Sequence, residues 1–169
     1  PNRAGGFSRP PFSLMPHRIL NVPKDGMIEG FNAALAARGI VADPAQLIAA
    51  MRLQKFYDEL LALKAARRGR LRKLLVRPEL PRGVWFWGGV GRGKSFLMDC
   101  FFAAVPYQRK RRVHFHAFMR EIHDSLRKHR NEPDPLAKVA ARIARETRLM
   151  CFDEFHVSDI ADAMMLGRL

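Results

Sequence analysis

Hydrophobic positions in the first part of the chain recur at helical spacing. From Met27 the run MIEGFNAALAARG is rich in alanine and ends at Gly39, a residue suited to a helix C-terminus. A second run, ADPAQLIAAMRLQKFYDELLALKAARRG, offers Asp43 as the N-cap and Pro44 at the first helical position. Its apolar residues lie three or four positions apart and predict one buried stripe: Leu53, Phe56, Leu60 and Leu63.

From Gly83 the pattern changes to short apolar runs that alternate with helical segments. The runs GVWFW (83–87), RVHFHAF (112–118) and RLMCFDE (148–154) predict strands. Helices are expected over 93–105, over 119–130, from Asp134 to about Glu146, and from Ser158 onwards. Strands that alternate with helices predict an α/β fold, in which a parallel sheet is covered on both faces and is preceded by a small helical region.

Composition adds a strong positive charge to this picture. The 169 residues carry a formal net charge of +14, and their apolar runs fall short of the ~18 residues of a transmembrane helix. Eight Lys or Arg residues lie between Lys64 and Arg82 against Glu79 alone, and RKRR follows at 109–112. Two readings stay open: a solvated helix end and turn, or a surface for nucleic acid, anionic membrane or an acidic partner.

A glycine-rich loop follows the first predicted strand. Gly88, Gly93, Lys94 and Ser95 match G-x-x-x-x-G-K-[ST], between a strand and a helix. Glycines let backbone N–H groups curl around phosphates, Lys94 contacts the β- and γ-phosphates, and Ser95 gives its hydroxyl to magnesium. The sequence therefore predicts a site for ATP and Mg²⁺. Its binding residues are Gly88, Gly89, Val90, Gly91, Arg92, Gly93, Lys94, Ser95 and Phe96.

Two acids end the third predicted strand. Phosphoryl transfer needs a carboxylate near magnesium and an oriented water, and Asp153 and Glu154 follow four apolar residues. We expect Asp153 to hold the metal together with Ser95, through water, and Glu154 to activate the attacking water. Lys94 and Glu154 are the catalytic candidates. The intervening strand is typical, by analogy of fold, of ATPases whose acidic strand does not neighbour the phosphate-loop strand.

Histidines and cysteines leave alternatives open. His114 and His116 are expected on one face of the middle strand and His123 on the next helix, packed around the sheet, with a zinc site as the alternative. His156 either senses the γ-phosphate or the acids, or is structural, and Asp159 either favours the helix dipole or faces the nucleotide. Cys100 and Cys151 lack Cys-x-x-Cys spacing and are expected to be reduced and buried, with a disulfide or metal role as the alternative.

Three strings resemble the Afg/ZapE family of AAA-type ATPases: WGGVGRGKSFLMD, RRVHFHAFMREIHDSL and LMCFDEFHVSDIADAMMLGRL. The similarity runs from about Asp43 to Leu169. It implies an ATPase related to helicase loaders and initiators that hydrolyses ATP to remodel a protein partner, such as a division-ring component, as a homo-oligomeric ring. Bacterial members act in the cytoplasm or at the inner membrane, and eukaryotic ones in mitochondria. The alternatives are a helicase-loader-like ATPase that uses Lys64–Arg82, and a nucleotide switch that does not hydrolyse ATP.

Composition and the change of pattern at Gly83 set the expected domain limits. Residues 1–26 are expected to be a disordered arm, 27–82 a helical N-terminal region, and 83–169 the N-terminal part of a P-loop ATPase domain. Family members continue past the DIADAM helix through a sensor strand, an arginine finger and a helical lid. We therefore expect this chain to be truncated after the acidic strand, with an incomplete sheet and little hydrolysis on its own.

Overall fold

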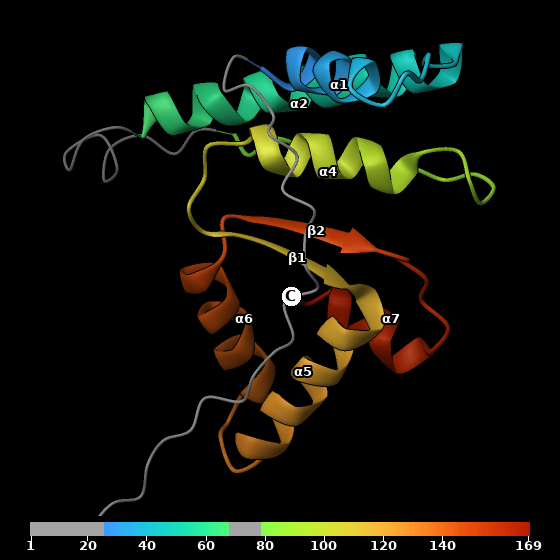
Figure 1. Ribbon diagram of the computed structural model, residues 1–169. Helices are drawn as coiled ribbons and strands as arrows, with labels where there is room; N and C mark the ends of the chain where they lie inside the picture. Colours follow the sequence, from blue (N-terminus) through green and yellow to red (C-terminus); the bar gives the residue numbers. More distant parts are fainter. Residues whose placement is uncertain (1–25, 68–78) are drawn as a thin grey trace, which may run out of the picture.

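The computed structural model describes residues 26–67 and 79–169, and it places a small parallel sheet between two groups of helices (Figure 1). In chain order the elements are α1 (Met27–Ala36), α2 (Pro44–Ala66), α4 (Lys94–Ala104), β1 (Lys110–His114), α5 (Phe115–Lys128), α6 (Pro135–Glu146), β2 (Leu149–Asp153) and α7 (Ile160–Leu166). Helices α1, α2 and α4 lie on one side of the sheet and α5, α6 and α7 on the other. None of the helices in the described ranges is both long and apolar enough to cross a bilayer.

Helices α1 and α2 lie side by side as a hairpin, called the N-terminal hairpin below. Its second helix begins as predicted: Asp43 is the N-cap, Pro44 follows, and the Asp43 and Gln46 side chains form a reciprocal capping box. Leu53, Phe56 and Leu60 are buried and Leu63 is half-buried, so three of the four residues of the predicted stripe are confirmed as buried. Residues 68–78 of the basic segment Lys64–Arg82 lie outside the described residues. The expected arm also lies outside them, apart from Gly26.

Helix α4 packs between the N-terminal hairpin and the sheet. The Phe56 and Phe101 rings stack with their centroids 5.4 Å apart, and Leu149 and Cys151 of β2 belong to the same buried cluster. Apolar side chains from α1, α2, α4 and β2 thus form one core, because each helix has a single apolar stripe to remove from water. Residues on both sides of the expected boundary at 82–83 contribute to it.

The sheet consists of β1 and β2 in the described residues, paired in parallel. Lys110 is opposite Leu149 and His114 is opposite Asp153, while α5 and α6 make the crossover between the strands. The mixed helix and strand order, with a parallel sheet covered on both faces, agrees with the predicted α/β class.

The strand predicted at 83–87 is wrong, because no strand is present there. Val84 and Phe86 pack against the first core, whereas the side chains of Trp85 and Trp87 are 70% and 83% exposed. The side chains therefore alternate as in a strand. A strand also needs a neighbour that accepts its backbone hydrogen bonds, and neither strand of the described sheet pairs with this segment.

The boundary predicted after the middle strand is also wrong. The strand ends at His114 and α5 starts at Phe115, four residues earlier than expected. Phe115, Phe118, Met119 and Ile122 lie at helical spacing and are all buried, so one continuous helical stripe includes the residues that were assigned to the strand. His116 is consequently an exposed residue of α5 rather than a partner of His114 on a strand.

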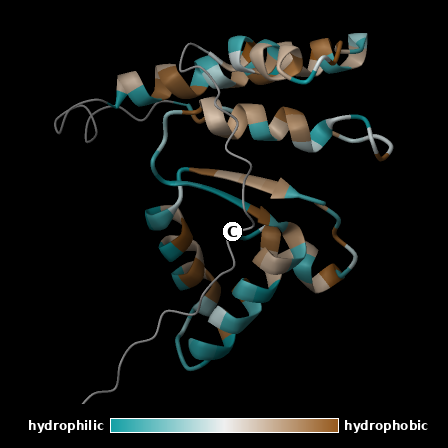
Figure 2. Cartoon of the chain, viewed as in Figure 1, coloured by the Kyte–Doolittle hydropathy of each residue, from teal (hydrophilic) through white to brown (hydrophobic). Residues whose placement is uncertain are grey.

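A second core lies on the other side of the sheet. Its buried residues come from α5 and α6. Helix α6 begins as predicted, with Asp134 as its N-cap and Pro135 as its first residue. Phe152 of β2 meets the Phe118 ring at 4.9 Å in an edge-on contact. Figure 2 shows β2 as mainly hydrophobic and the first part of β1 as hydrophilic.

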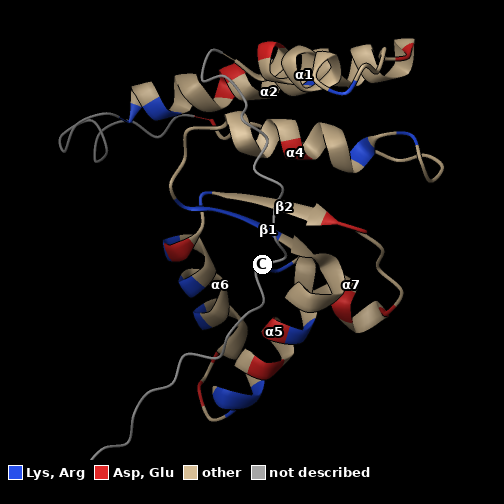
Figure 3. Ribbon diagram, in the orientation of Figure 1, with Lys and Arg blue, Asp and Glu red and all other residues tan. Residues whose placement is uncertain are grey.

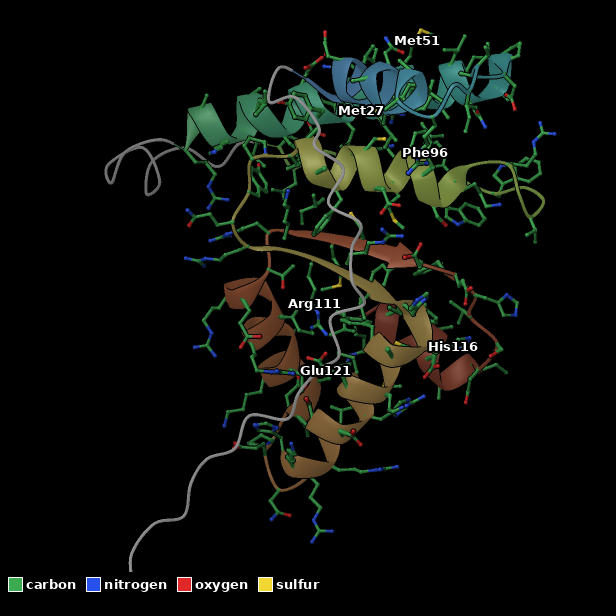
Figure 4. All side chains as sticks on the ribbon, viewed as in Figure 1. Met27, Met51, Phe96, Arg111, His116 and Glu121 are labelled. Atoms are coloured by element: carbon green, nitrogen blue, oxygen red, sulfur yellow. The ribbon has the colours of Figure 1, made fainter. Side chains whose placement is uncertain are left out.

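One acid anchors α5 and α6 to β1. Glu121 of α5 pairs with Arg111 of β1 and lies 3.4 Å from Arg142 of α6 (Figure 4). Its side chain is 16% exposed. Burial alone would raise the pKa of Glu121, but the hydrogen bonds and charges of the two arginines outweigh burial and hold this pKa below its usual value of 4.5.

We predict that Glu121→Gln lowers the free energy of unfolding by about 1–2 kcal/mol at neutral pH, because two arginines lose their charged acceptor. A lowered folded-state pKa means that this stabilisation is full above 4.5 and is lost as the pH falls through the folded-state pKa. Urea unfolding of both proteins from neutral pH down to about pH 3 checks this. A difference that stays constant over the whole range would contradict the prediction.

Candidate nucleotide site

The loop 88–95 runs into the N-terminus of α4, and its last two residues, Lys94 and Ser95, are the first two of the helix. Gly88, Gly91 and Gly93 have φ of 139°, 80° and 77°, a region that favours glycine. A Cβ on Gly88, Gly89 or Gly91 would meet no atom within 4 Å, so these glycines face open space. The first backbone N–H groups of α4 have no partner within the helix, because they belong to its first turn. Such an end attracts phosphate groups.

Lys94 folds back over this loop. Its ammonium donates hydrogen bonds to the carbonyl oxygens of Gly88 (2.8 Å) and Gly89 (2.6 Å). The positive charge is thereby held at the mouth of the loop. Ser95 is exposed in the first turn of α4, and Phe96 is half-buried against the N-terminal hairpin. The remaining loop residues, Val90 and Arg92, are exposed.

Asp153 ends β2 and is tied to α4 through one arginine. Nε of Arg112 donates to Oδ2 of Asp153 at 2.7 Å, and the same guanidinium pairs with Asp99 of α4. The side chains of Arg112 and Asp153 are each 13% exposed. Asp99 follows Ser95 by four residues and lies on the same face of the helix. Arg112 therefore holds Asp153 beneath the helix that carries the predicted magnesium ligand Ser95.

Glu154 stands in a sharp turn directly after β2. Its φ of 52° makes it the residue other than glycine with a left-handed backbone in the described ranges. Such a conformation costs about 1–3 kcal/mol and is concentrated at functional sites. Its side chain is 77% exposed, and its Oε2 lies 4.0 Å from Nδ1 of His114, a buried atom that has no hydrogen-bond partner in the structure.

The loop and the acids lie toward the same end of the sheet. Figure 1 shows the loop before α4 on the side to which the arrowheads of β1 and β2 point. In open α/β folds this carboxyl edge of parallel strands is where ligands bind. The predicted phosphate-loop residues and the predicted acid pair thus lie toward the same end of the described sheet. The acid pair follows a paired strand, whereas the segment before the loop is not paired with the described sheet.

The other candidate residues are dispersed. His123 of α5 contacts Asp162 of α7 at 2.9 Å, and the part of the chain that the structure describes contains no group of three potential metal ligands. The zinc alternative therefore has no support there. The Asp159 side chain caps α7 by accepting from the Ala161 N–H, and His156 is exposed. Burial raises the pKa of both Cys100 and Cys151 to about 11, so both are neutral buried thiols.

Sequence patterns did not reveal the roles of four residues near this site. They are Gln46, Asp99, Arg112 and His114, the last through its contact with Glu154. Asp99 had a signal, since it lies one turn after Ser95. Arg112 was read as part of a basic run, whereas its partners lie 13 residues before it and 41 residues after it. No local pattern connects Gln46 with the loop, because 46 residues separate it from Arg92.

The comparisons with known proteins identify the family of this chain. The family model for the AFG1-like ATPases matches residues 27–169. The chain belongs to the AFG1-like ATPase family. The matched region covers every described element, and the α/β fold with its small parallel sheet fits a P-loop NTPase.

Curated relatives of this AFG1-like chain occur in bacteria and in eukaryotes. The cell division protein ZapE of Escherichia coli is 53% identical over 88 residues, which make up 52% of this chain and 24% of the relative. Lactation elevated protein 1 homolog B of Danio rerio is 44% identical over 104 residues, 55% of this chain and 21% of the relative. The chain thus matches about a quarter of the length of these relatives. No solved structure matches it.

We predict that Gly93→Ala lowers the free energy of unfolding by about 1–2 kcal/mol, because the new residue must adopt φ of 77° and its Cβ would lie 2.8 Å from Nε2 of Gln46. Gly89→Ala is the matched control: Gly89 has an ordinary φ and open space around it, so its unfolding free energy should change by less than ~0.5 kcal/mol. Chemical denaturation of the three proteins checks the difference. Equal values for both variants would contradict it.

Proposed function

We propose that this AFG1-like chain binds ATP in loop 88–95 and supplies the groups that hydrolyse it. The observation that carries the proposal is the Lys94 ammonium, held over an open glycine loop at the N-terminus of α4. Loop N–H groups and the helix end would bind the β- and γ-phosphates. Lys94 would exchange the carbonyls of Gly88 and Gly89 for phosphate oxygens, which are stronger acceptors because they are charged.

Glu154 is the proposed general base. Its exposed carboxylate lies just beyond the sheet edge, where a water between it and the γ-phosphate can be reached. The water oxygen bonds to the γ-phosphorus, its proton passes to Glu154, and the bond from the γ-phosphorus to the bridging oxygen breaks to leave ADP and phosphate. His114, 4.0 Å from the carboxylate, helps to hold it at this edge.

Ser95 and Asp153 fit the metal that this chemistry uses. A hydroxyl and a carboxylate are oxygen donors, which Mg²⁺ prefers over nitrogen or sulfur. Magnesium, when bound, would neutralise the charge that builds up on the phosphate oxygens. Asp153 would act through water, because its Oδ2 already accepts a hydrogen bond from Arg112. Arg112 thereby fixes the direction in which the carboxylate points.

We predict that two substitutions separate binding from turnover. Lys94→Ala should abolish ATP binding, because the loop loses the cation that matches the phosphates. Glu154→Gln should bind ATP with unchanged affinity and lose turnover by about 10²- to 10⁴-fold, as expected for removal of a general base. Calorimetric titration with ATP and steady-state phosphate release check both. If Glu154→Gln leaves turnover unchanged, Glu154 is not the base. If the wild-type chain binds ATP without turnover, the proposal that this chain by itself supplies the groups that hydrolyse ATP fails.

The activity of the whole protein is proposed from its relatives. The bacterial relative is named for cell division, so we propose that ATP hydrolysis is coupled to the remodelling of a protein partner such as a division-ring component. A homo-oligomeric ring in the bacterial cytoplasm, or at the inner membrane, is part of this proposal. A mitochondrial location would follow for a eukaryotic source.

A second candidate function, an ATPase linked to nucleic acid, is favoured by a cluster of cations around Tyr107. The Lys64 ammonium lies 6.0 Å from the centre of the Tyr107 ring, and Arg109 donates to the Arg145 carbonyl at 2.6 Å. Burial raises the pKa of Tyr107 while the charges of Arg148 and Arg67 oppose this. We call this cluster the Tyr107 basic surface, formed by Lys64, Arg67, Arg109, Arg145 and Arg148. Figure 3 shows Lys and Arg residues in blue at the start of β1 and toward the end of α2.

If this surface binds nucleic acid, the double variant Arg145→Gln/Arg148→Gln should weaken binding of a duplex oligonucleotide. The slope of log K against log salt should become shallower by about 0.9 for each phosphate that the variant no longer neutralises. Arg127→Gln/Lys128→Gln, at the C-terminal end of α5, is the charge-matched control and should leave the slope unchanged. Titrations at several salt concentrations check this. Equal slopes for both variants would exclude the surface as a specific nucleic-acid contact.

A further inference from the structure

The phosphate loop is touched by one side chain from the N-terminal hairpin. Gln46, in the first turn of α2, accepts a hydrogen bond from the Asp43 N–H through Oε1 at 3.3 Å. Its Nε2 donates to the carbonyl oxygen of Arg92 at 3.2 Å. A single amide group therefore joins the helix cap of α2 to the loop before α4.

This contact determines how one peptide group of the loop faces. The peptide between Arg92 and Gly93 is planar and trans, so its carbonyl and its N–H point in opposite directions. Because Gln46 holds the carbonyl toward α2, the Gly93 N–H is directed away from α2. A reversed peptide would instead aim a carbonyl oxygen away from α2, and a carbonyl oxygen repels phosphate.

Glycine at position 93 matches this contact. A Cβ there would lie 2.8 Å from Nε2 of Gln46, so a side chain would displace the amide from the loop. The left-handed φ of 77° excludes most other residues for a second reason. The close approach of Gln46 and the turn into α4 thus depend on the same glycine.

Two further contacts hold the next turn of α4 against the hairpin. The rings of Phe31 and Phe96 are tilted with centroids 5.8 Å apart, and the Arg38 guanidinium lies 4.4 Å above the Phe96 ring. Phe96 directly follows Ser95. The hairpin therefore contacts the loop on both sides of Lys94 and Ser95, through Gln46 before them and through Phe31 and Arg38 after them.

We propose that Gln46 is a positioning residue for the phosphate loop and that the N-terminal hairpin is thereby coupled to the phosphates of a nucleoside di- or triphosphate. The proposal deepens the proposed function and rests on it for its ligand. It predicts reciprocity: a partner that moves the hairpin changes nucleotide affinity, and a bound nucleotide strengthens the packing of the hairpin by the same factor. No nucleotide contact by Gln46 itself is required.

Three variants of the full chain separate positioning from helix capping. Gln46→Ala removes both amide contacts. Gln46→Glu keeps an acceptor for the Asp43 N–H and removes the donor to Arg92. Asp43→Ala removes the carboxylate that accepts from the Gln46 N–H at 2.8 Å and leaves the Gln46 side chain in place. Effects shared with Asp43→Ala report the helix cap, and effects confined to the Gln46 variants report the loop.

The first measurement is amide hydrogen exchange in the protein without nucleotide. Exchange at residues 91–95 should become at least about tenfold faster in both Gln46 variants and change less than about twofold in Asp43→Ala, because local opening there is no longer opposed by the hydrogen bond from Gln46. This readout does not depend on nucleotide binding, and no phosphate is present for the new carboxylate to repel. Unchanged exchange in the Gln46 variants, or equal acceleration in Asp43→Ala, overturns the proposal.

The second measurement is calorimetric titration with ADP, beside steady-state kinetics with ATP. Gln46→Ala should weaken ADP affinity and raise KM by about fivefold to twentyfold while kcat changes less than about twofold, since loop position acts on binding. Equal affinity losses in Gln46→Ala and Asp43→Ala overturn the coupling. If the wild-type chain binds no ADP, the proposed function fails, and hydrogen exchange still decides whether Gln46 positions the loop.

Discussion

Three consecutive cations on β1 hold the two groups of helices to the sheet. Successive side chains of a strand point to opposite faces, so Lys110 and Arg112 face α4 whereas Arg111 faces α5 and α6. Lys110 donates to the Val105 carbonyl at 2.7 Å and to that of Phe102 at the end of α4. Burial lowers the pKa of Lys110, and these carbonyls offset the loss of water around its charge. A half-buried cation without such acceptors would be costly, so Lys110 fixes the end of α4 relative to the strand.

The same alternation builds the candidate site. Arg112 reaches both Asp99 on α4 and Asp153 on β2, so the helix that carries the phosphate loop and the strand that carries the acids are joined by one guanidinium. A planar, permanently charged fork suits this role better than a lysine would. The run at 109–112, read from sequence as a surface charge, is thus largely committed to internal contacts. Arg109 is its exposed member, and it belongs to the Tyr107 basic surface.

The N-terminal hairpin and the phosphate loop are parts of one packed unit. The hairpin shares a core with α4, and its polar contact through Gln46 reaches the loop itself. The loop has few other supports: the segment 83–87 before it is extended and unpaired, and its two tryptophans are exposed. Because the loop is anchored mainly by the N-terminal hairpin, a movement of the hairpin would move the loop. This is the physical basis of the proposed influence of the hairpin on nucleotide binding.

Local chemistry let the sequence specify much of this molecule. Asp43 with Pro44 and Asp134 with Pro135 start α2 and α6, because caps act within one turn, and the glycine-lysine-serine pattern located the loop and its helix. Such local patterns did not show that 83–87 forms no strand or that α5 begins at Phe115. A strand depends on a neighbour, and the helical stripe of α5 outweighs the β-propensity of its aromatic residues. Only the tertiary structure could decide the partners of Arg112 and Gln46, because packing brings together residues that are tens of positions apart in the chain.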